Sequence, residues 1–149
     1  MKLKSLFLVT AVGFLFPAFV SAQEAKDAKA EELEAKFKET MTAVIMTGRW
    51  CPLKDGVLGP EKEDKYTIER VEKIKGDDWV IYARLQYAKR EVVVPIPVQV
   101  KWAGDTAVII VDALQIPGGA GYGGNSYFAR VLVHDKTYAG TWSGGDHGV

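Results

Sequence analysis

From Met41 onward apolar and polar residues alternate, and turn signals recur about every ten residues. Alternation with a period of two is typical of strands that bury one face. No helical stretch of useful length separates these runs, so successive strands should pair antiparallel. The sequence therefore predicts an all-β antiparallel meander of about seven strands over residues 41–149, forming an open barrel or sandwich. The predicted strands are Thr42–Trp50, Lys65–Ile74, Trp79–Tyr87, Val92–Trp102, Thr106–Gln115, Tyr127–His134 and Tyr138–Trp142.

Residues 1–22 have the order of a secretory signal peptide. Lys2 and Lys4 precede the apolar run Leu6–Val20, and small residues lead to a predicted cut before Gln23. A membrane anchor is the alternative, but the run is short for a span and Pro17 lies in its last third. We therefore expect an exported protein, periplasmic or secreted, that does not span a membrane.

Residues 23–40 form a separate N-terminal segment, helical or flexible, that is rich in Ala, Glu and Lys. Leu33, Phe37 and Met41 would form one narrow apolar stripe on a helix. Such a stripe could cover apolar residues on the outer face of the predicted sheet.

Composition excludes several classes of function. Without the signal, Lys2 and Lys4 are lost, which leaves 17 basic and 19 acidic residues and a formal charge of −2. This balance gives no basic face for nucleic acid. Cys51 is the single cysteine, so no internal disulfide forms, and two histidines make a multi-histidine metal site improbable. We expect no metal and no cofactor.

Two glycine–aspartate turns set the expected register. Gly76-Asp77 and Gly104-Asp105 suit two-residue type II′ hairpins. The second turn places Ala103 opposite Thr106, which gives a row of apolar pairs and identifies the core face. These predicted pairs are Trp102–Ala107, Val100–Ile109, Val98–Val111 and Ile96–Ala113.

The first turn leaves two charged residues on an apolar face. Pairing across it sets Ile74 opposite Trp79 and brings Arg70 and Glu72 to the same face. Either the two line a polar cavity, or a bulge between Ile68 and Val71 turns them outward; the cost of burying charge favours the bulge.

Pro95 and Pro97 remove two hydrogen-bond donors along one flank of their strand. Since the tight turn commits this strand to Thr106–Gln115, we expect the open flank to face Trp79–Tyr87. The barrel should therefore be split there.

The long loops gather at one end of a meander, and that end is the expected ligand mouth. They are Cys51–Asp64, Ala88–Glu91, Ile116–Ser126 and the tail after Trp142. The third loop matches the letters G-x-G-x-x-G, but the strand-like run that follows argues against a dinucleotide site. The candidate ligand-binding residues are Trp50, Tyr122, Arg130 and Trp142.

A polar row runs across three strands in the same register. Joining Gln115 to Tyr127 sets Asp112 opposite Arg130, and a three-residue turn at Asp135–Thr137 sets Arg130 opposite Trp142. The row could bind a polar ligand or be a structural salt bridge with cation–π stacking; we favour the structural interpretation. Val108, Ile110 and Leu132 lie beside the row, and the helical stripe could cover them.

Ser143 lies in a segment that resembles a nucleophile elbow only superficially, because Thr141 stands where that elbow needs glycine. A hydrolase would have to bring Ser143, His147 and a carboxylate within hydrogen-bond reach.

Thr47–Trp50 and Ala139–Trp142 resemble the glycine–tryptophan segments of calycin-type barrels, the lipocalin and avidin kind. That resemblance implies a barrel that binds a small hydrophobic ligand. The prolines at 95 and 97 depart from the pattern.

Thr47–Cys51 together with Tyr138–Gly148 resembles a family of uncharacterised exported bacterial β-domain proteins. In that family the chain continues past the Asp-His-Gly segment into one more strand. The resemblance implies export, a β domain, and exposed edges on the first and seventh strands.

Three functions follow as hypotheses. The leading one is a non-enzymatic exported domain that binds a small apolar or aromatic ligand at the long-loop end. The alternative is an envelope protein-interaction domain that uses open strand edges or the N-terminal helix. The third is the hydrolase.

Overall fold

The computed structural model describes residues 18–87, 90–115, 126–144 and 147–148. The chain divides into two compact units, Met1–Glu32 and Leu33–Val149. In the first unit the described residues belong to helix α1 (Ala18–Thr40), and those from 22 to 32 are exposed. Within the described residues, no helix combines the length and the hydropathy that a membrane crossing requires.

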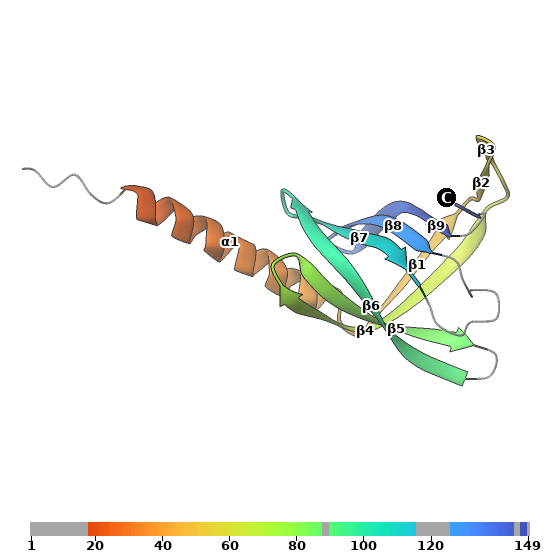
Figure 1. The fold of residues 1–149 in the computed structure, drawn as a ribbon, viewed down its shortest axis with the longest axis horizontal. Helices are drawn as coiled ribbons and strands as arrows, with labels where there is room; N and C mark the ends of the chain where they lie inside the picture. Colours follow the sequence, from red (N-terminus) through yellow and green to blue (C-terminus); the bar gives the residue numbers. More distant parts are fainter. Residues whose placement is uncertain (1–17, 88–89, 116–125, 145–146, 149) are drawn as a thin grey trace, which may run out of the picture. The chain divides into compact units, whose positions relative to one another are not determined.

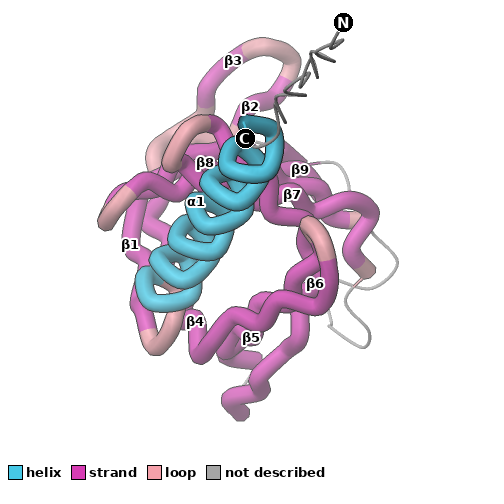
Figure 2. The backbone as a smooth tube through the Cα atoms, turned by 90° about the vertical axis from the view of Figure 1, so that its left-hand side faces the viewer, coloured by secondary structure: helices cyan, strands magenta, loops and turns pink. Residues whose placement is uncertain are grey.

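The second unit is an antiparallel meander (Figure 1), as the sequence predicts. Neighbouring strands of its main sheet also follow one another along the chain. The sheet curls into a half-barrel (Figure 2). The sheet order is β1 (Val44–Trp50), β4 (Lys62–Lys75), β5 (Asp78–Tyr87), β6 (Arg90–Ala103), β7 (Thr106–Leu114), β8 (Tyr127–His134), β9 (Thr137–Gly144) and β10 (His147–Gly148).

A short hairpin interrupts the first long loop. Strands β2 (Leu53–Lys54) and β3 (Val57–Leu58) pair across Asp55-Gly56, and both turn residues have positive φ. Asp-Gly is a strong signal for this type of turn, yet the prediction treated the segment as a plain loop.

The two glycine–aspartate turns form as predicted. Gly76 and Gly104 have positive φ, and Ala103 lies opposite Thr106. The expected pairs Trp102–Ala107 and Val100–Ile109 are confirmed, but β6–β7 pairing ends at Gln99–Ile110. The predicted pairs Val98–Val111 and Ile96–Ala113 are therefore not formed.

The flank of β6 that lacks the N–H donors of Pro95 and Pro97 faces β7. The prediction that this flank faces β5 was wrong. Strand β6 pairs with β5 from Arg90 to Gln99, including Pro95 with Tyr82 and Pro97 with Val80. The reason is the alternation of backbone groups. Beside the tight turn, the backbone groups of Ala103 bond to Thr106 of β7. Every second residue before Ala103 faces β7 in the same way, and positions 97 and 95 belong to this set. The missing donors of Pro95 and Pro97 therefore open the β6–β7 seam.

The predicted bulge in β4 is confirmed. Ile68 pairs with Ala83 and Arg70 with Tyr82, so Glu69 is the extra residue. Arg70 and Glu72 are exposed and form an ion pair at 2.8 Å, which removes any need for a buried polar cavity.

A second irregularity in β4 was not predicted. It lies between Lys73 and Lys75 and leaves Ile74 60% exposed. Trp79 consequently pairs with Lys73, and the expected Ile74–Trp79 pair is wrong.

The end of α1 closes the core. Phe37 and Met41 are 3% and 2% exposed, and the Phe37 ring meets Trp79 and Trp102 edge-on at centroid distances of 5.3 and 6.1 Å. Phe37 and Met41 of the predicted apolar stripe therefore pack against the inner face of the sheet. The expectation that the stripe covers residues on the outer face was wrong, since Leu132 there is 46% exposed. Inner aromatic rings offer more apolar contact area than the outer row.

Ion pairs hold the same helix end. Glu34 accepts a hydrogen bond from Lys73 of β4, and Lys36 donates to Asp135 at 2.7 Å. The bond from Lys36 holds the pKa of the Asp135 carboxyl below its ordinary value.

Candidate functional site

Arg130 in β8 is fixed by a bulge in β7. Ile110, and not Asp112, lies opposite Arg130, because Tyr127 pairs with Leu114 instead of Gln115 and the register shifts by one more residue between Val111 and Leu114. The guanidinium still reaches Asp112 at 2.7 Å and also donates to the carbonyl oxygens of Val111 and Ala129 at 3.0 and 2.8 Å. Ala113 within the bulge has a φ of 51°. Arg130 thus satisfies carbonyl oxygens beside a distorted segment.

Trp142 does not join this row. His134 pairs with Thr137 across a two-residue turn, whereas the prediction used three residues. Arg130 therefore lies opposite Thr141, and Trp142 lies opposite Ala129. Because successive residues alternate between the faces of a strand, the one-residue error moves Trp142 to the other face.

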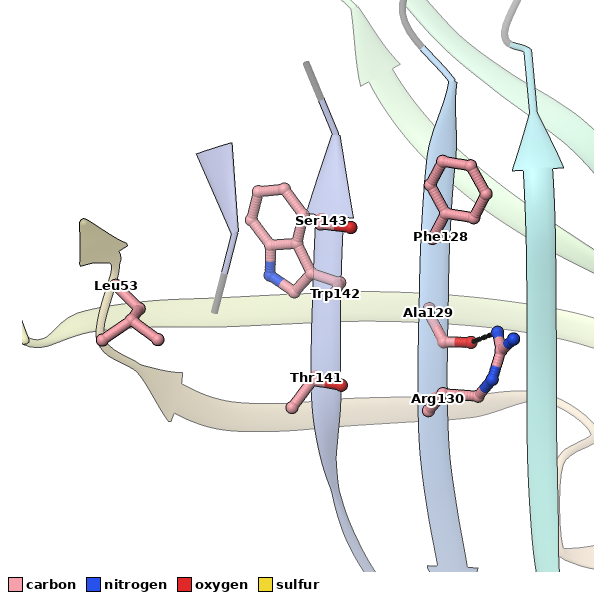
Figure 3. A pocket seen from close by; sticks show the side chains of 7 residues that line it. All are labelled: Leu53, Phe128, Ala129, Arg130, Thr141, Trp142 and Ser143. Atoms are coloured by element: carbon pink, nitrogen blue, oxygen red, sulfur yellow. Dashed lines mark hydrogen bonds between the residues drawn. The ribbon is translucent and has the colours of Figure 1, made fainter. Parts of the chain in front are cut away.

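An open hollow of about 440 Å³ lies where β8, β9 and β2 meet. Figure 3 shows Phe128 and Arg130 on one strand, Thr141 and Ser143 on the next, and Leu53 across from them. Phe128 is 43% exposed and Leu53 49% exposed, so apolar surface is open to solvent here. The residues lining the hollow are Leu53, Phe128, Ala129, Arg130, Thr141, Trp142 and Ser143. Two predicted ligand-binding residues, Arg130 and Trp142, are among them.

The predicted residue Trp50 contacts Trp142. Their ring centroids are 5.5 Å apart at an interplanar angle of 64°, and both side chains are half-buried. The ammonium group of Lys62 lies 4.9 Å from the Trp50 ring centroid, in the range of a cation–π contact. Trp142 therefore links the hollow to an aromatic pair that joins β1 to β9.

The carboxylate of Asp64 in β4 interacts with two tyrosine hydroxyl groups near the Trp50–Trp142 pair. Tyr138 of β9 donates to the Asp64 carboxylate at 2.8 Å. Burial, and then the neighbouring Asp64, raises the pKa of Tyr138 to about 12. The same two causes, in the same order, raise the pKa of Tyr66. Both tyrosines remain protonated donors at neutral pH.

Sequence reasoning missed Lys62, Asp64, Tyr66 and Tyr138. The signal was present, because Asp64, Tyr66 and Ile68 alternate along one face and Gly48 lies opposite Asp64. A Cβ at Gly48 would lie 2.9 Å from Asp64 Oδ1 and would overlap the Tyr138 hydroxyl oxygen. The glycine is therefore required by the approach of Tyr138.

Some predicted residues fall elsewhere. Tyr122 and the glycine-rich loop lie outside the described residues. Ser143 pairs with Gly148 and His147 with Gly144 in the β9–β10 ladder, and the side chain of His147 is also outside the described part. The hydrolase stays a prediction. Among the described residues, no three of His, Cys, Asp or Glu gather as a metal site would require.

No protein-family model, curated protein or solved structure matches this chain. The functional proposal therefore depends on the geometry of the site.

Replacing Asp64 by asparagine should lower the pKa of Tyr138 from about 12, because the variant removes the negative charge that opposes tyrosinate. Ultraviolet absorbance during an alkaline titration measures this shift, and Tyr138→Phe identifies which step belongs to Tyr138.

The raised pKa of Tyr138 also implies that the protein loses stability as pH rises from about 10, the unfolded value, through about 12. A Tyr138 that titrates at its ordinary value in the parent protein would contradict the Asp64 contact.

Proposed function

We propose that this protein is a non-catalytic domain of an exported chain, and that it binds a small apolar or aromatic ligand in the hollow between β2, β8 and β9. The observation that supports the proposal is the open hollow of about 440 Å³, which combines exposed Phe128 and Leu53 with Trp142 and Arg130. Export is proposed from the signal-like order of residues 1–22, and the exported protein should begin at Gln23.

The chemistry of the hollow fits such a ligand. Ligand sites commonly have volumes of about 300–1,000 Å³, apolar walls and a few polar groups that fix orientation. Here Phe128 and Leu53 offer apolar surface, while the Thr141 and Ser143 hydroxyl groups and the Arg130 guanidinium are the polar groups. The guanidinium is held by two carbonyl groups and by Asp112, which also balances its charge, so it is a hydrogen-bond donor in a fixed position.

The position of the hollow favours the outer surface of the sheet over its interior as the place where a ligand binds. The inner face is packed by Phe37, Met41 and Trp79, each no more than 3% exposed. The hollow instead includes the outward-facing Phe128 and Arg130, beside the β2–β3 hairpin. We therefore place ligand binding at the surface of the sheet and not inside it.

Phe128→Ala should weaken binding of 1-anilinonaphthalene-8-sulfonate about tenfold, because an aromatic contact and its buried area are worth about 1–2 kcal/mol. This probe combines aromatic rings with an anion that can approach Arg130. Fluorescence titration of the probe measures the change.

Leu132→Ala is the matched control. Leu132 lies on the same face of β8 and is 46% exposed against 43% for Phe128, but it does not line the hollow. Circular dichroism must show that both variants remain folded, since loosened proteins also bind this probe. Equal affinities for the two variants would reject the hollow as the site.

A further inference from the structure

We propose that the gap between β1 and β9 accepts an extended segment of a partner polypeptide, which pairs with both strands as one additional strand. This surface shares Thr141 and Trp142 with the hollow, but it is tested on backbone amides and not on the Phe128 side chain, so either proposal can fail without the other.

Both strands have an unpaired flank within the described residues. Strand β1 pairs with β4 alone. Strand β9 pairs with β8 along its length, and β10 covers only Ser143 and Gly144 on its other flank. Unpaired flanks of this kind are where strand addition occurs.

The two flanks face each other. The Tyr138 hydroxyl group of β9 reaches Asp64 of β4 and lies against Gly48 of β1, while Trp142 meets Trp50. A tyrosine side chain spans the distance, so β1 and β9 are farther apart than the roughly 4.8 Å between paired strands. An even number of antiparallel pairings separates β1 from β9, so the two run in the same direction. One strand antiparallel to both is the pairing partner that suits this geometry.

Backbone N–H and C=O groups of successive strand residues point to opposite flanks, which identifies the groups on each open flank. Val100 of β6 donates to Asp77, and the β5–β6 register has no shift. The N–H and C=O groups of Arg84 therefore point to β4, where they bond with Thr67. The groups of Thr67 point away from β1, so those of the opposite residue Ile45, and of Thr47, point to the open flank. The two-residue turn bonds Thr137 to His134, so the corresponding groups of Tyr138 and Gly140 point to the open flank of β9.

The residues of these strands lack the features that usually protect an edge. Proteins blunt exposed edges with charged side chains and prolines. Val44–Trp50 and Thr137–Gly144 contain no proline and one charged residue, Arg49, which is already paired with Glu61 at 2.5 Å. The outward-facing side chains beside the gap are those of Ile45, Thr47, Ala139 and Thr141. The partner segment should therefore be uncharged, with hydroxyl or apolar side chains outward.

The side chains on the inner face of the gap limit the size of the partner's inward-facing side chains. Tyr138 and Trp142 lie beneath the gap on the inner face, so inward side chains must be small. Strand β10 already pairs antiparallel with the end of β9 on this flank. The partner strand should continue in that direction.

Amide hydrogen exchange tests the proposal on the full chain. The probe is a synthetic peptide of alternating threonine and alanine, as long as β9. At saturation, exchange should slow about tenfold or more at the amides of Ile45, Thr47, Tyr138 and Gly140, which gain hydrogen bonds. The amides of Met46 and Ala139, which face β4 and β8, should not change.

Two controls make the result decisive. A peptide with an N-methyl group at every residue lacks the donors for both strands and should give no protection. Joining the unmethylated segment after Val149 by a short Gly-Ser linker raises its effective concentration to about millimolar, so weak affinity cannot hide pairing. Absence of protection in the tethered chain overturns the proposal. Protection that appears without peptide and rises with protein concentration overturns it in favour of a second copy.

Discussion

Phe37→Ala is expected to lower the free energy of unfolding by about 3–5 kcal/mol, as is typical when a large aromatic side chain is removed from a core. Phe37 is 3% exposed, and its ring meets both Trp79 and Trp102 edge-on. The substitution removes these contacts and opens the inner face to water. Urea unfolding measures the loss, and a red shift of tryptophan emission should accompany it.

Phe128→Ala is the matched control for this prediction. The same atoms are removed, but Phe128 is 43% exposed on the outer face. Its loss should cost about 1 kcal/mol or less. If the two variants are equally stable, the end of α1 is not part of the folded core, which would contradict the contacts of Phe37.

The strands were predictable because their physical signals are local. Alternation identifies a half-buried strand, and glycine at the first turn position fixes Ala103 opposite Thr106. Even the Glu69 bulge could be anticipated, because the alternative would bury Arg70 and Glu72. The direction in which Pro95 and Pro97 open the sheet also follows from the alternation of backbone groups beside the same turn.

The composition of the site was harder to predict because it depends on single-residue shifts. Asp135 adopts a φ of 48° in a two-residue turn, a conformation that favours glycine, so the sequence favours a longer turn. That one residue transfers Trp142 from the face of Arg130 to that of Trp50. Ala113 adopts a similar φ in the β7 bulge and shifts Asp112 away from its expected position. The predicted row of Asp112, Arg130 and Trp142 is therefore broken at two places by shifts of register.

The contact of β8 with β9 leads to the last prediction, for Gly140→Ala. A Cβ at this position would overlap the carbonyl oxygen of Arg130 and lie 2.8 Å from the Cα atom of Val131. Both obstacles are backbone atoms, so no side-chain rotation relieves the overlap, and the two strands must separate. We expect a loss of about 2–3 kcal/mol in the free energy of unfolding, measured by urea titration.

Gly48→Ala separates this effect from the general cost of replacing a glycine in a strand. Its Cβ would meet the Tyr138 hydroxyl group and the Asp64 carboxylate, which are tips of side chains that can move. The expected loss is about 1 kcal/mol, the worth of one hydrogen bond. Displacing the hydroxyl from Asp64 should also lower the pKa of Tyr138 from about 12. If Gly48→Ala proves the more damaging substitution, the backbone approach at Gly140 does not limit the pairing of β8 with β9. The closure of β1 against β9 through Tyr138 would then be the more rigid part of the sheet.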